Sequence, residues 1–214
     1  MLLTEERPQA FREYRVDPEE AGAVGTAAVA AARTLHARAV GCTGWAVHVS
    51  HDRLRVVTVE AWRDAESYRR AGALGHPAGR RPTSALYRHV ATDGVSPTPV
   101  GDPTAGVIVI DCFRVGRSLV RPVSAFNVRN GRAFNRSPGC VSTTVLRSTA
   151  AGRVATSARW TRTEDFLAAF AAARGTSVAG TEEINRATAA LTRGLVRTDY
   201  HTYELLDVDE GDRS

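Results

Sequence analysis

The sequence GCTGWAVHVSHDRLRVVTVEAWRDAESY at residues 41–68 returns in altered form as GCVSTTVLRSTAAGRVATSARWTRTEDF at residues 139–166. Both stretches begin with Gly-Cys, and both carry Thr-x-x-x-Trp, as Thr58 to Trp62 and Thr156 to Trp160. An acidic residue follows each tryptophan at the same distance, and the alignment needs no gap. An unbroken register over this length indicates an internal duplication.

Each half of the chain predicts the same order of elements. In the first half we expect strands at 10–16, 44–50, 53–62 and 85–92, with helices at 18–39 and from Asp64. In the second half we expect strands at 106–115, 140–148, 153–160 and 199–208, with helices at 119–135, 163–174 and, as an addition, 181–195. The predicted domains are 1–95 and 107–209, joined by a linker at 96–106 and followed by a frayed tail at 210–214.

The order βαββαβ, found twice, predicts an α+β fold of two tandem ferredoxin-like units. The strand that ends at Trp62 carries apolar residues on both faces: Val56, Thr58, Glu60 and Trp62 alternate with Val57, Val59 and Ala61. A sheet covered by helices on one side and by a second sheet on the other needs this pattern. We therefore expect an intramolecular, pseudo-dimeric α+β barrel.

Composition limits the classes of function. The net charge is +5 and every basic residue is arginine, but the arginines are interspersed with acids, so nucleic-acid binding is not favoured. No apolar run is long enough for a membrane helix, and the first residues do not resemble a secretory signal. Three cysteines without metal-ligand spacing fit a reducing compartment, so we expect a cytoplasmic protein without a bound metal.

This layout resembles the antibiotic biosynthesis monooxygenase superfamily, within the dimeric α+β barrel group. The resemblance rests on the Gly-Cys before each hairpin, the strand ends EAW and ARW, and the helix starts DAESY and TEDF. It covers most of the chain, in two copies. Such relatives include cofactor-free oxygenases of aromatic polyketides, haem-degrading enzymes, polyketide cyclases and proteins without known activity.

The sequence departs from that family at informative positions. Members that oxidise anthrone-like polyketides or haem typically carry an asparagine four residues before the tryptophan, where this chain has Thr58 and Thr156. Haem-degrading members need a histidine about ten residues after the tryptophan, and here Gly72 and Phe170 occupy that region. Haem degradation is therefore disfavoured.

The resemblance implies a site with an aromatic wall, an apolar cavity and a polar group for an oxyanion. The catalytic candidates are His48, Trp62 and Tyr14, and the substrate-binding candidates are Arg12, Thr58, Glu60, His89 and Trp160. We expect Glu60 to pair with an arginine, since an unpaired buried carboxylate is costly. Weaker candidates are His201, Tyr203 and Asn127.

The second copy lacks several of these polar groups. Leu146 stands where the first copy has His48, Ala158 stands where it has Glu60, and Phe113 aligns with Tyr14. These differences predict one working site, near Trp62, with Trp160 in a structural role.

The function implied by the resemblance is cofactor-independent oxidation of a phenolic or anthrone-type polyketide to a quinone, with dioxygen as co-substrate. Two alternatives stay open: a polyketide cyclase of the same barrel group, and a non-catalytic protein that binds a ligand or stabilises a partner. The sequence also leaves open whether two such chains pair as a homodimer.

Overall fold

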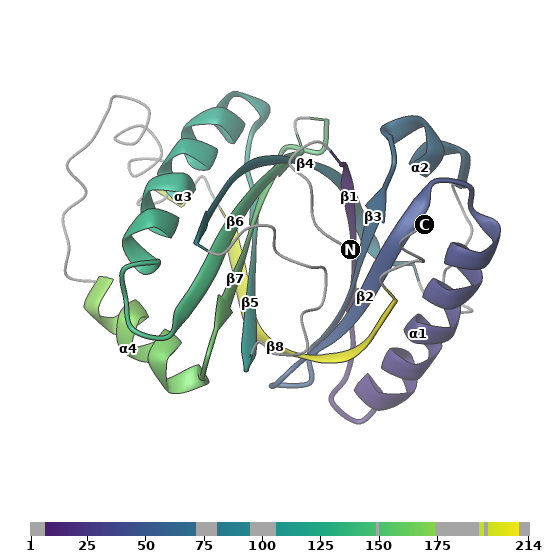
Figure 1. Ribbon diagram of the computed structural model, residues 1–214, viewed down its shortest axis with the longest axis horizontal. Helices are drawn as coiled ribbons and strands as arrows, with labels where there is room; N and C mark the ends of the chain where they lie inside the picture. Colours follow the sequence, from purple (N-terminus) through teal and green to yellow (C-terminus); the bar gives the residue numbers. More distant parts are fainter. Residues whose placement is uncertain are drawn as a thin grey trace. The chain divides into compact units, whose positions relative to one another are not determined.

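The computed structural model describes residues 7–71, 81–94, 106–148, 150–173, 193–194 and 197–209. Most of the predicted extra helix at 181–195, almost all of the linker and the tail at 210–214 lie outside these residues. The elements in chain order are β1 (Gln9–Arg15), α1 (Ala21–Arg38), β2 (Cys42–Ser50), β3 (Arg55–Trp62), α2 (Ala65–Ala71), β4 (Thr83–Gly94), β5 (Val107–Arg114), the short 3-10 helix η1 (Arg117–Leu119), α3 (Val120–Phe134), β6 (Cys140–Ser148), β7 (Arg153–Trp160), α4 (Thr163–Ala173) and β8 (Arg197–Asp209) (Figure 1).

The strand order confirms the predicted fold class. The hydrogen-bonded order is β1-β3-β2-β8-β5-β7-β6-β4 in a closed sheet. The central strand of each half pairs antiparallel with both neighbours: β3 with β1 and β2, and β7 with β5 and β6. Each half thus has the order of a ferredoxin-like unit, in which the first and third strands are adjacent. The fold is α+β, with the duplicated organisation expected from the sequence.

The chain divides into two compact units that do not coincide with its two sequence halves. Unit 1 takes the described residues up to Arg88 together with 203–209, and unit 2 takes 89–94 together with the described residues from 106 to 202. The last part of β8 joins unit 1 because Ser50 to Trp45 of β2 pair with Tyr203 to Asp209. Long-range strand pairing of this kind leaves no mark in local sequence patterns.

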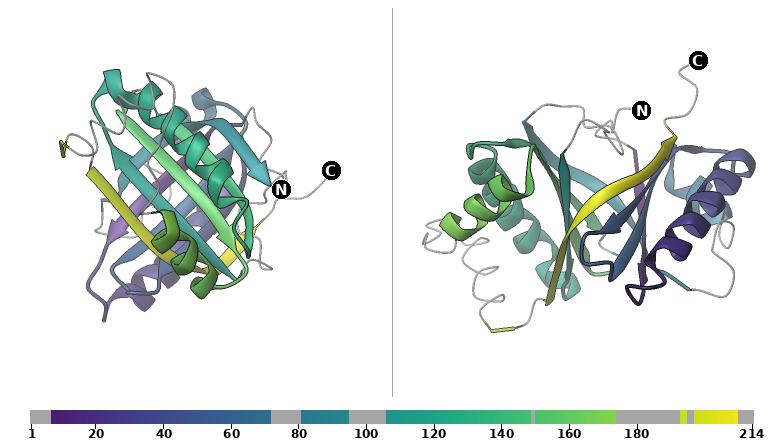
Figure 2. Two further views of the ribbon diagram at one scale, coloured as in Figure 1. Left: turned by 90° about the vertical axis from the view of Figure 1, so that its left-hand side faces the viewer. Right: turned by 90° about the horizontal axis from the view of Figure 1, so that it is seen from below.

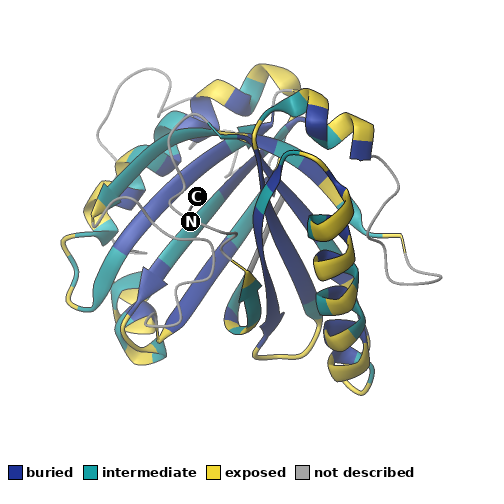
Figure 3. Cartoon of the chain, turned by 45° about the vertical axis from the view of Figure 1, so that its right-hand side comes forward, coloured by how far each residue is buried: buried dark blue, intermediate teal, exposed yellow. Residues whose placement is uncertain are grey.

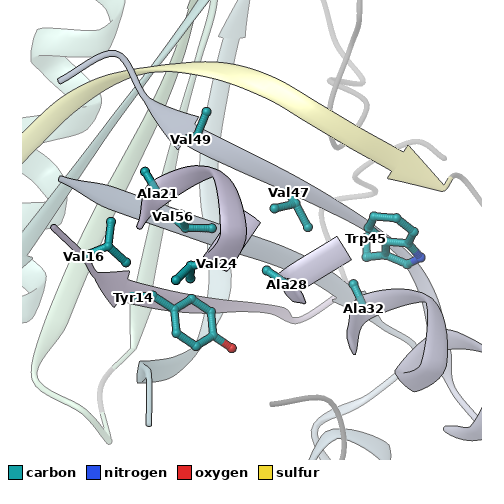
Figure 4. Close-up of a cluster of buried hydrophobic side chains, with 10 residues drawn as sticks. All are labelled: Tyr14, Val16, Ala21, Val24, Ala28, Ala32, Trp45, Val47, Val49 and Val56. Atoms are coloured by element: carbon teal, nitrogen blue, oxygen red, sulfur yellow. The ribbon is translucent and has the colours of Figure 1, made fainter. Parts of the chain in front are cut away.

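Helix α1 covers one face of the unit 1 sheet. Its buried side recurs every three to four residues and consists mostly of alanine and valine, so the helix approaches the strands closely. Figure 4 shows this contact, with Trp45 and Val47 of β2, Val56 of β3 and Tyr14 of β1 pointing toward the helix. The opposite side of α1 is exposed, as the alternating colours in Figure 3 show.

Helices α3 and α4 lie against the strands of unit 2 (Figure 2). Val120 and Val123 of α3 pack with Phe113, Val145 and Val154 of three strands. A side chain at Gly131 would approach the Thr143 hydroxyl to 2.7 Å, so this glycine permits the contact between α3 and β6. Among the helices of the described segments, none is long and apolar enough to cross a membrane.

The repeated Gly-Cys builds the same joint in both units. Gly41 and Gly139 both have positive φ, at 100° and 81°, a region that favours glycine. The Gly41 carbonyl accepts a bond from Arg63 N–H at 2.7 Å, and the Gly139 carbonyl accepts one from Thr161 N–H at 2.8 Å. A register shift follows each cysteine, between Cys42 and Gly44 and between Cys140 and Ser142. The joint therefore repeats in geometry as well as in sequence.

Candidate functional site

The unit 1 sheet has two faces, and the predicted site residues divide between them. The strand ladders place Arg12 beside Thr58, Tyr14 beside Val56, and Ala10 beside Glu60. This set shares the face of the core residues that pack against α1, which include Tyr14, Val56 and, further along, Trp62. His48 pairs with Val57, which lies on the opposite face of β3 from Val56 and Thr58. His48 is therefore on the face of the sheet that does not pack against α1.

A buried ion pair forms the centre of the helix-covered face. Arg12 Nε lies 2.6 Å from Glu60 Oε1, and Arg12 Nη2 donates to Glu60 Oε2 at 3.3 Å. The indole N–H of Trp62 donates to the same Oε2 at 3.1 Å. The side chains of Arg12 and Glu60 are 2% and 1% exposed. The expected pairing of Glu60 with an arginine is confirmed, and we call Arg12, Glu60 and Trp62 the Arg-Glu-Trp cluster.

Opposing effects determine the pKa of the Glu60 carboxyl group. Burial raises its pKa above the ordinary value, while the Arg12 guanidinium and the donated hydrogen bonds oppose that rise. Burial penalises a charge that is not solvated, and the adjacent cation compensates for it. A carboxyl with a raised pKa and an adjacent cation has the features of a general base that works beside an oxyanion site.

Two tyrosines lie within electrostatic reach of the Arg-Glu-Trp cluster. Burial raises the pKa of Tyr14 to about 12, with Arg12 lowering it and Glu60 raising it. The pKa of Tyr68 is also raised by burial, with the same two opposing influences. The Tyr68 ring packs edge-on against Trp62, with centroids 5.6 Å apart and planes at 76°. Both hydroxyls therefore stay protonated near neutral pH and are available as hydrogen-bond donors.

Tyr68 is the member of this arrangement that the sequence interpretation missed. It is half-buried on α2, whereas Trp62 is completely buried at the end of β3. The available signal was its position six residues after Trp62, in the first turns of a helix that starts at the joint. Since Tyr68 is the partly exposed member, it marks the side of the cluster nearest to solvent.

His48 is not part of the Arg-Glu-Trp cluster, which corrects the expectation of one shared site. Its ring is 2% exposed and faces Tyr203 edge-on, with centroids 6.5 Å apart. Burial lowers the pKa of His48 to about 4, and the Val57 backbone partly opposes this shift. The imidazole is therefore neutral at physiological pH. The physical reason for the separation is strand alternation, which sends paired residues to one face and their neighbours to the other.

Unit 2 has an apolar version of the same joint. Trp160 packs edge-on against Phe134 and Phe166, at 6.2 and 5.8 Å between centroids. Its indole N–H has no hydrogen-bond partner, because Ala158 occupies the position of Glu60. The ladder places Asp111 beside Thr156, as Arg12 lies beside Thr58. Trp160 is thus part of an aromatic core.

The remaining predicted residues are not members of the Arg-Glu-Trp cluster. His89 belongs to unit 2, where its Nε2 lies 2.8 Å from the Thr92 hydroxyl. The Asn127 amide donates to the Val123 carbonyl of its own helix at 3.0 Å. His201 lies in the unit 2 part of β8, and Tyr203 lies beside His48. Thr58 is buried between Arg12 and Val47 in the ladder.

The described residues contain no group of three or more histidine, cysteine or acidic side chains that could hold a metal ion. The thiol of Cys42 is buried, and this burial together with Glu60 raises its pKa to about 12. It is therefore a thiol rather than a reactive thiolate at neutral pH.

A duplicated α+β barrel with a buried Arg-Glu-Trp cluster beneath helices defines the class of protein. Residues 10–76 match the family model described as antibiotic biosynthesis monooxygenase. This segment carries β1, α1, β2, β3 and α2, and hence the whole cluster with Tyr14 and Tyr68. This part of the chain is therefore similar to the antibiotic biosynthesis monooxygenase family. No curated protein sequence matches the chain.

Solved structures share the complete fold. An anthrone oxidase-like protein is 16% identical with a TM-score of 0.74, over 100% of this chain and 98% of its own. A candidate monooxygenase from Fusobacterium nucleatum subsp. nucleatum is 8% identical with a TM-score of 0.60, over 97% and 95%. One from Lactobacillus acidophilus is 11% identical with a TM-score of 0.53, over 97% and 98%. At these identities the likeness establishes the fold.

Proposed function

We propose that this chain is a cofactor-independent monooxygenase that oxidises a phenolic or anthrone-type aromatic compound to a quinone at the Arg-Glu-Trp cluster. The observation that carries the proposal is the buried Glu60 carboxylate, which is bonded to both Arg12 and the Trp62 indole. The match of residues 10–76 to a monooxygenase family model supports the same function.

The chemistry requires a base, a site for an anion and an aromatic wall. Glu60 accepts a proton from the acidic CH2 or OH group of the substrate, and Arg12 stabilises the resulting oxyanion. The anion transfers one electron to dioxygen, and the two radicals combine to a peroxide, which loses water as the carbonyl forms. For an anthrone, the CH2 group and one O2 give a C=O group and one H2O, so atoms and electrons balance. Tyr68 and Trp62 supply the aromatic surface.

The proposed reaction requires that the substrate reach the Arg-Glu-Trp cluster. Trp62 and Glu60 are 0% and 1% exposed, so the substrate has to displace side chains before it reaches the carboxylate. Tyr68 is the partly exposed member and lies on the short helix α2. We therefore assign entry to the Tyr68 side, by movement of its ring.

The sealed cluster also favours a second candidate, a non-catalytic member that retains the fold. Both Glu60 oxygens are already bonded to neighbouring side chains, as in a structural ion pair. In addition, Thr58 occupies the position at which relatives that oxidise anthrone-like compounds typically carry asparagine.

Oxygen uptake with 1,8-dihydroxyanthrone separates these functions. Uptake with quinone formation supports the monooxygenase, conversion without uptake supports a cyclase, and neither supports the non-catalytic protein. Glu60→Gln should reduce the rate by about 100-fold or more, the typical contribution of a positioned general base. Glu66→Gln is the matched control, because that carboxylate is 59% exposed on α2 and pairs with Arg69. If Glu60→Gln turns over as fast as Glu66→Gln, Glu60 is not the base.

A further inference from the structure

Positive charge is concentrated in one long segment of unit 2. Residues 112–163 contain ten arginines and no acidic residue, and this segment includes η1, α3, β6 and β7. The mixture of basic and acidic residues expected from the sequence therefore holds for the chain as a whole but not for this segment. Because it contains no carboxylate of its own, its arginines give a positive surface unless another segment or another molecule supplies the anions.

Five of these arginines surround the solvent side of helix α3. They are exposed residues of η1, of α3 and of the turn that follows α3: Arg117, Arg121, Arg129, Arg132 and Arg136. Within the described part of the chain, none of the five forms an ion pair or a side-chain hydrogen bond. The three on α3 itself span about 80° of the helix circumference and about 16 Å along its axis. We call the five residues the α3 arginine face.

Each of the other helices in the described segments has an arginine that is paired with an acid. Arg33 Nη2 of α1 lies 2.6 Å from Asp207 Oδ2, and α2 has such a pair within one helical turn. Just before α4, Arg162 Nη2 lies 3.0 Å from Asp165 Oδ1. Helix α1 is the counterpart of α3 in the duplicated fold, since each follows the first strand of its unit. The fold therefore does not require a helix with unpaired arginines at this place.

The charges on α3 oppose the stability of the helix. Arg129 and Arg132 are three residues apart, a spacing at which like charges repel each other on a helix surface. Arg121 lies in the first turn, which contains no acidic residue, and the helix dipole disfavours a cation there. A charge pattern that destabilises its own helix, and that the first copy of the fold lacks, indicates a binding surface rather than a structural one.

The residues between the arginines favour a helix of another protein as the partner. Ala125 and Val128 are half-buried and lie on the same side of α3 as Arg121 and Arg132, and small side chains permit close helix packing. No aromatic or large aliphatic side chain of α3 is exposed. The face therefore lacks the apolar anchor of a membrane-surface helix and an aromatic ring on which a nucleic-acid base could stack. Guanidinium groups match carboxylates, which they can bind through two parallel hydrogen bonds.

We propose that the α3 arginine face binds an acidic helix of a protein partner. The aspartates or glutamates of that helix recur every three to four residues, so that they form one stripe and pair with Arg121, Arg129 and Arg132. This surface belongs to unit 2, so it is independent of the reaction proposed at the Arg-Glu-Trp cluster of unit 1.

The probes are two synthetic helical peptides of equal composition and length, about 18 residues each. One carries its glutamates in a single stripe, and the other distributes the same glutamates around the helix; circular dichroism checks that both are equally helical. Fluorescence anisotropy measures their affinity for the full chain. We expect tighter binding of the striped peptide, and a loss of about tenfold with Arg121→Gln/Arg132→Gln, because two exposed ion pairs are removed.

Arg38→Gln/Arg70→Gln is the matched control, because it removes the same charge from exposed positions on α1 and α2. Preferential binding of the striped peptide, lost in the α3 double variant and kept in the control, supports the proposal. Equal binding of the two peptides, binding of neither, or equal losses in the two double variants overturns it. Tighter binding of a DNA duplex or of phosphatidylserine vesicles through the same arginines also overturns it, because the partner is then a nucleic acid or a membrane. Oxygen uptake should be unchanged in both variants, and thermal unfolding checks that both are folded.

Discussion

Removing one partner of the buried ion pair should destabilise unit 1 strongly, whereas removing both should not. The perturbations are Glu60→Leu, Arg12→Leu and the double replacement. The two contacts between these side chains are 2.6 and 3.3 Å long, and the side chains are 1% and 2% exposed. Glu60→Leu leaves the buried Arg12 guanidinium without its anion, and Arg12→Leu leaves the buried Glu60 carboxylate without its cation.

The magnitude follows from this burial. Breaking a buried pair by removing one partner costs about 3–5 kcal/mol, which for a chain of this length lowers Tm by about 6–20 °C. The double variant leaves no buried charge, and its remaining cost is the Trp62 N–H without an acceptor, about 1–3 kcal/mol. The double-mutant cycle should therefore give a coupling energy of about 3 kcal/mol or more.

The assay is urea unfolding followed by tryptophan fluorescence in a Trp160→Phe background. The two remaining tryptophans, Trp45 and Trp62, both lie in unit 1. Glu66→Leu is the control, because Arg69 and Glu66 also lie 2.6 Å apart but are 67% and 59% exposed, so the loss should stay below about 1 kcal/mol. Single variants that cost no more than this control, or a double variant as unstable as the sum of the singles, would refute the reasoning.

Three further predictions test single positions. Trp62→Phe should cost about 1–2 kcal/mol more than Trp160→Phe in urea unfolding, because Trp62 loses a hydrogen bond and Trp160 loses an N–H without a partner; equal costs would contradict this. Gly41→Ala, at φ +100° and with Ser67 2.6 Å from the new Cβ, should lower Tm, whereas Gly22→Ala in α1, with nothing within 4 Å, should raise stability by about 0.4–1 kcal/mol. The pKa of His48 is lowered from 6.5 to about 4 in the folded state. As the pH falls, the unfolded chain therefore binds this proton before the folded chain does, and the free energy of unfolding should fall by about 3 kcal/mol between pH 6.5 and about pH 4. His48→Leu should remove that part of the pH dependence, measured as the difference from wild type.

The sequence was sufficient to predict the elements and the division of β3 into two faces. Alternation along Val56 to Trp62 correctly separated Thr58, Glu60 and Trp62 from the valines between them. This worked because strand parity is a local property. The repeated Gly-Cys predicted a duplication, and in the structure both glycines have positive φ.

The face of His48 could not be predicted in the same way. It depends on the register of β2 against β3, which the turn after Ser50 and the irregularity between Cys42 and Gly44 determine together. A slip of one residue would have paired His48 with Val56 or Thr58 and so put it on the same face of the sheet as Trp62. The division of β4 and β8 between the two units could not be predicted from the sequence either, because it depends on pairing between strands that are far apart in the sequence.

The differences between the two copies show which residues belong to the fold and which to the site. Both copies keep the tryptophan at the joint, where it fills the space between sheet and helices. The polar groups changed together: where unit 1 has Arg12 and Glu60, unit 2 has Asp111 and Ala158. A buried charge cannot persist without its partner, so loss of the carboxylate removes the reason for the arginine. The tyrosines followed, as Phe113 and Phe166 in the positions of Tyr14 and Tyr68. The presence of the complete charged and hydroxylated set in unit 1 alone therefore supports the proposal that any chemistry of this chain takes place on the helix-covered face near Trp62.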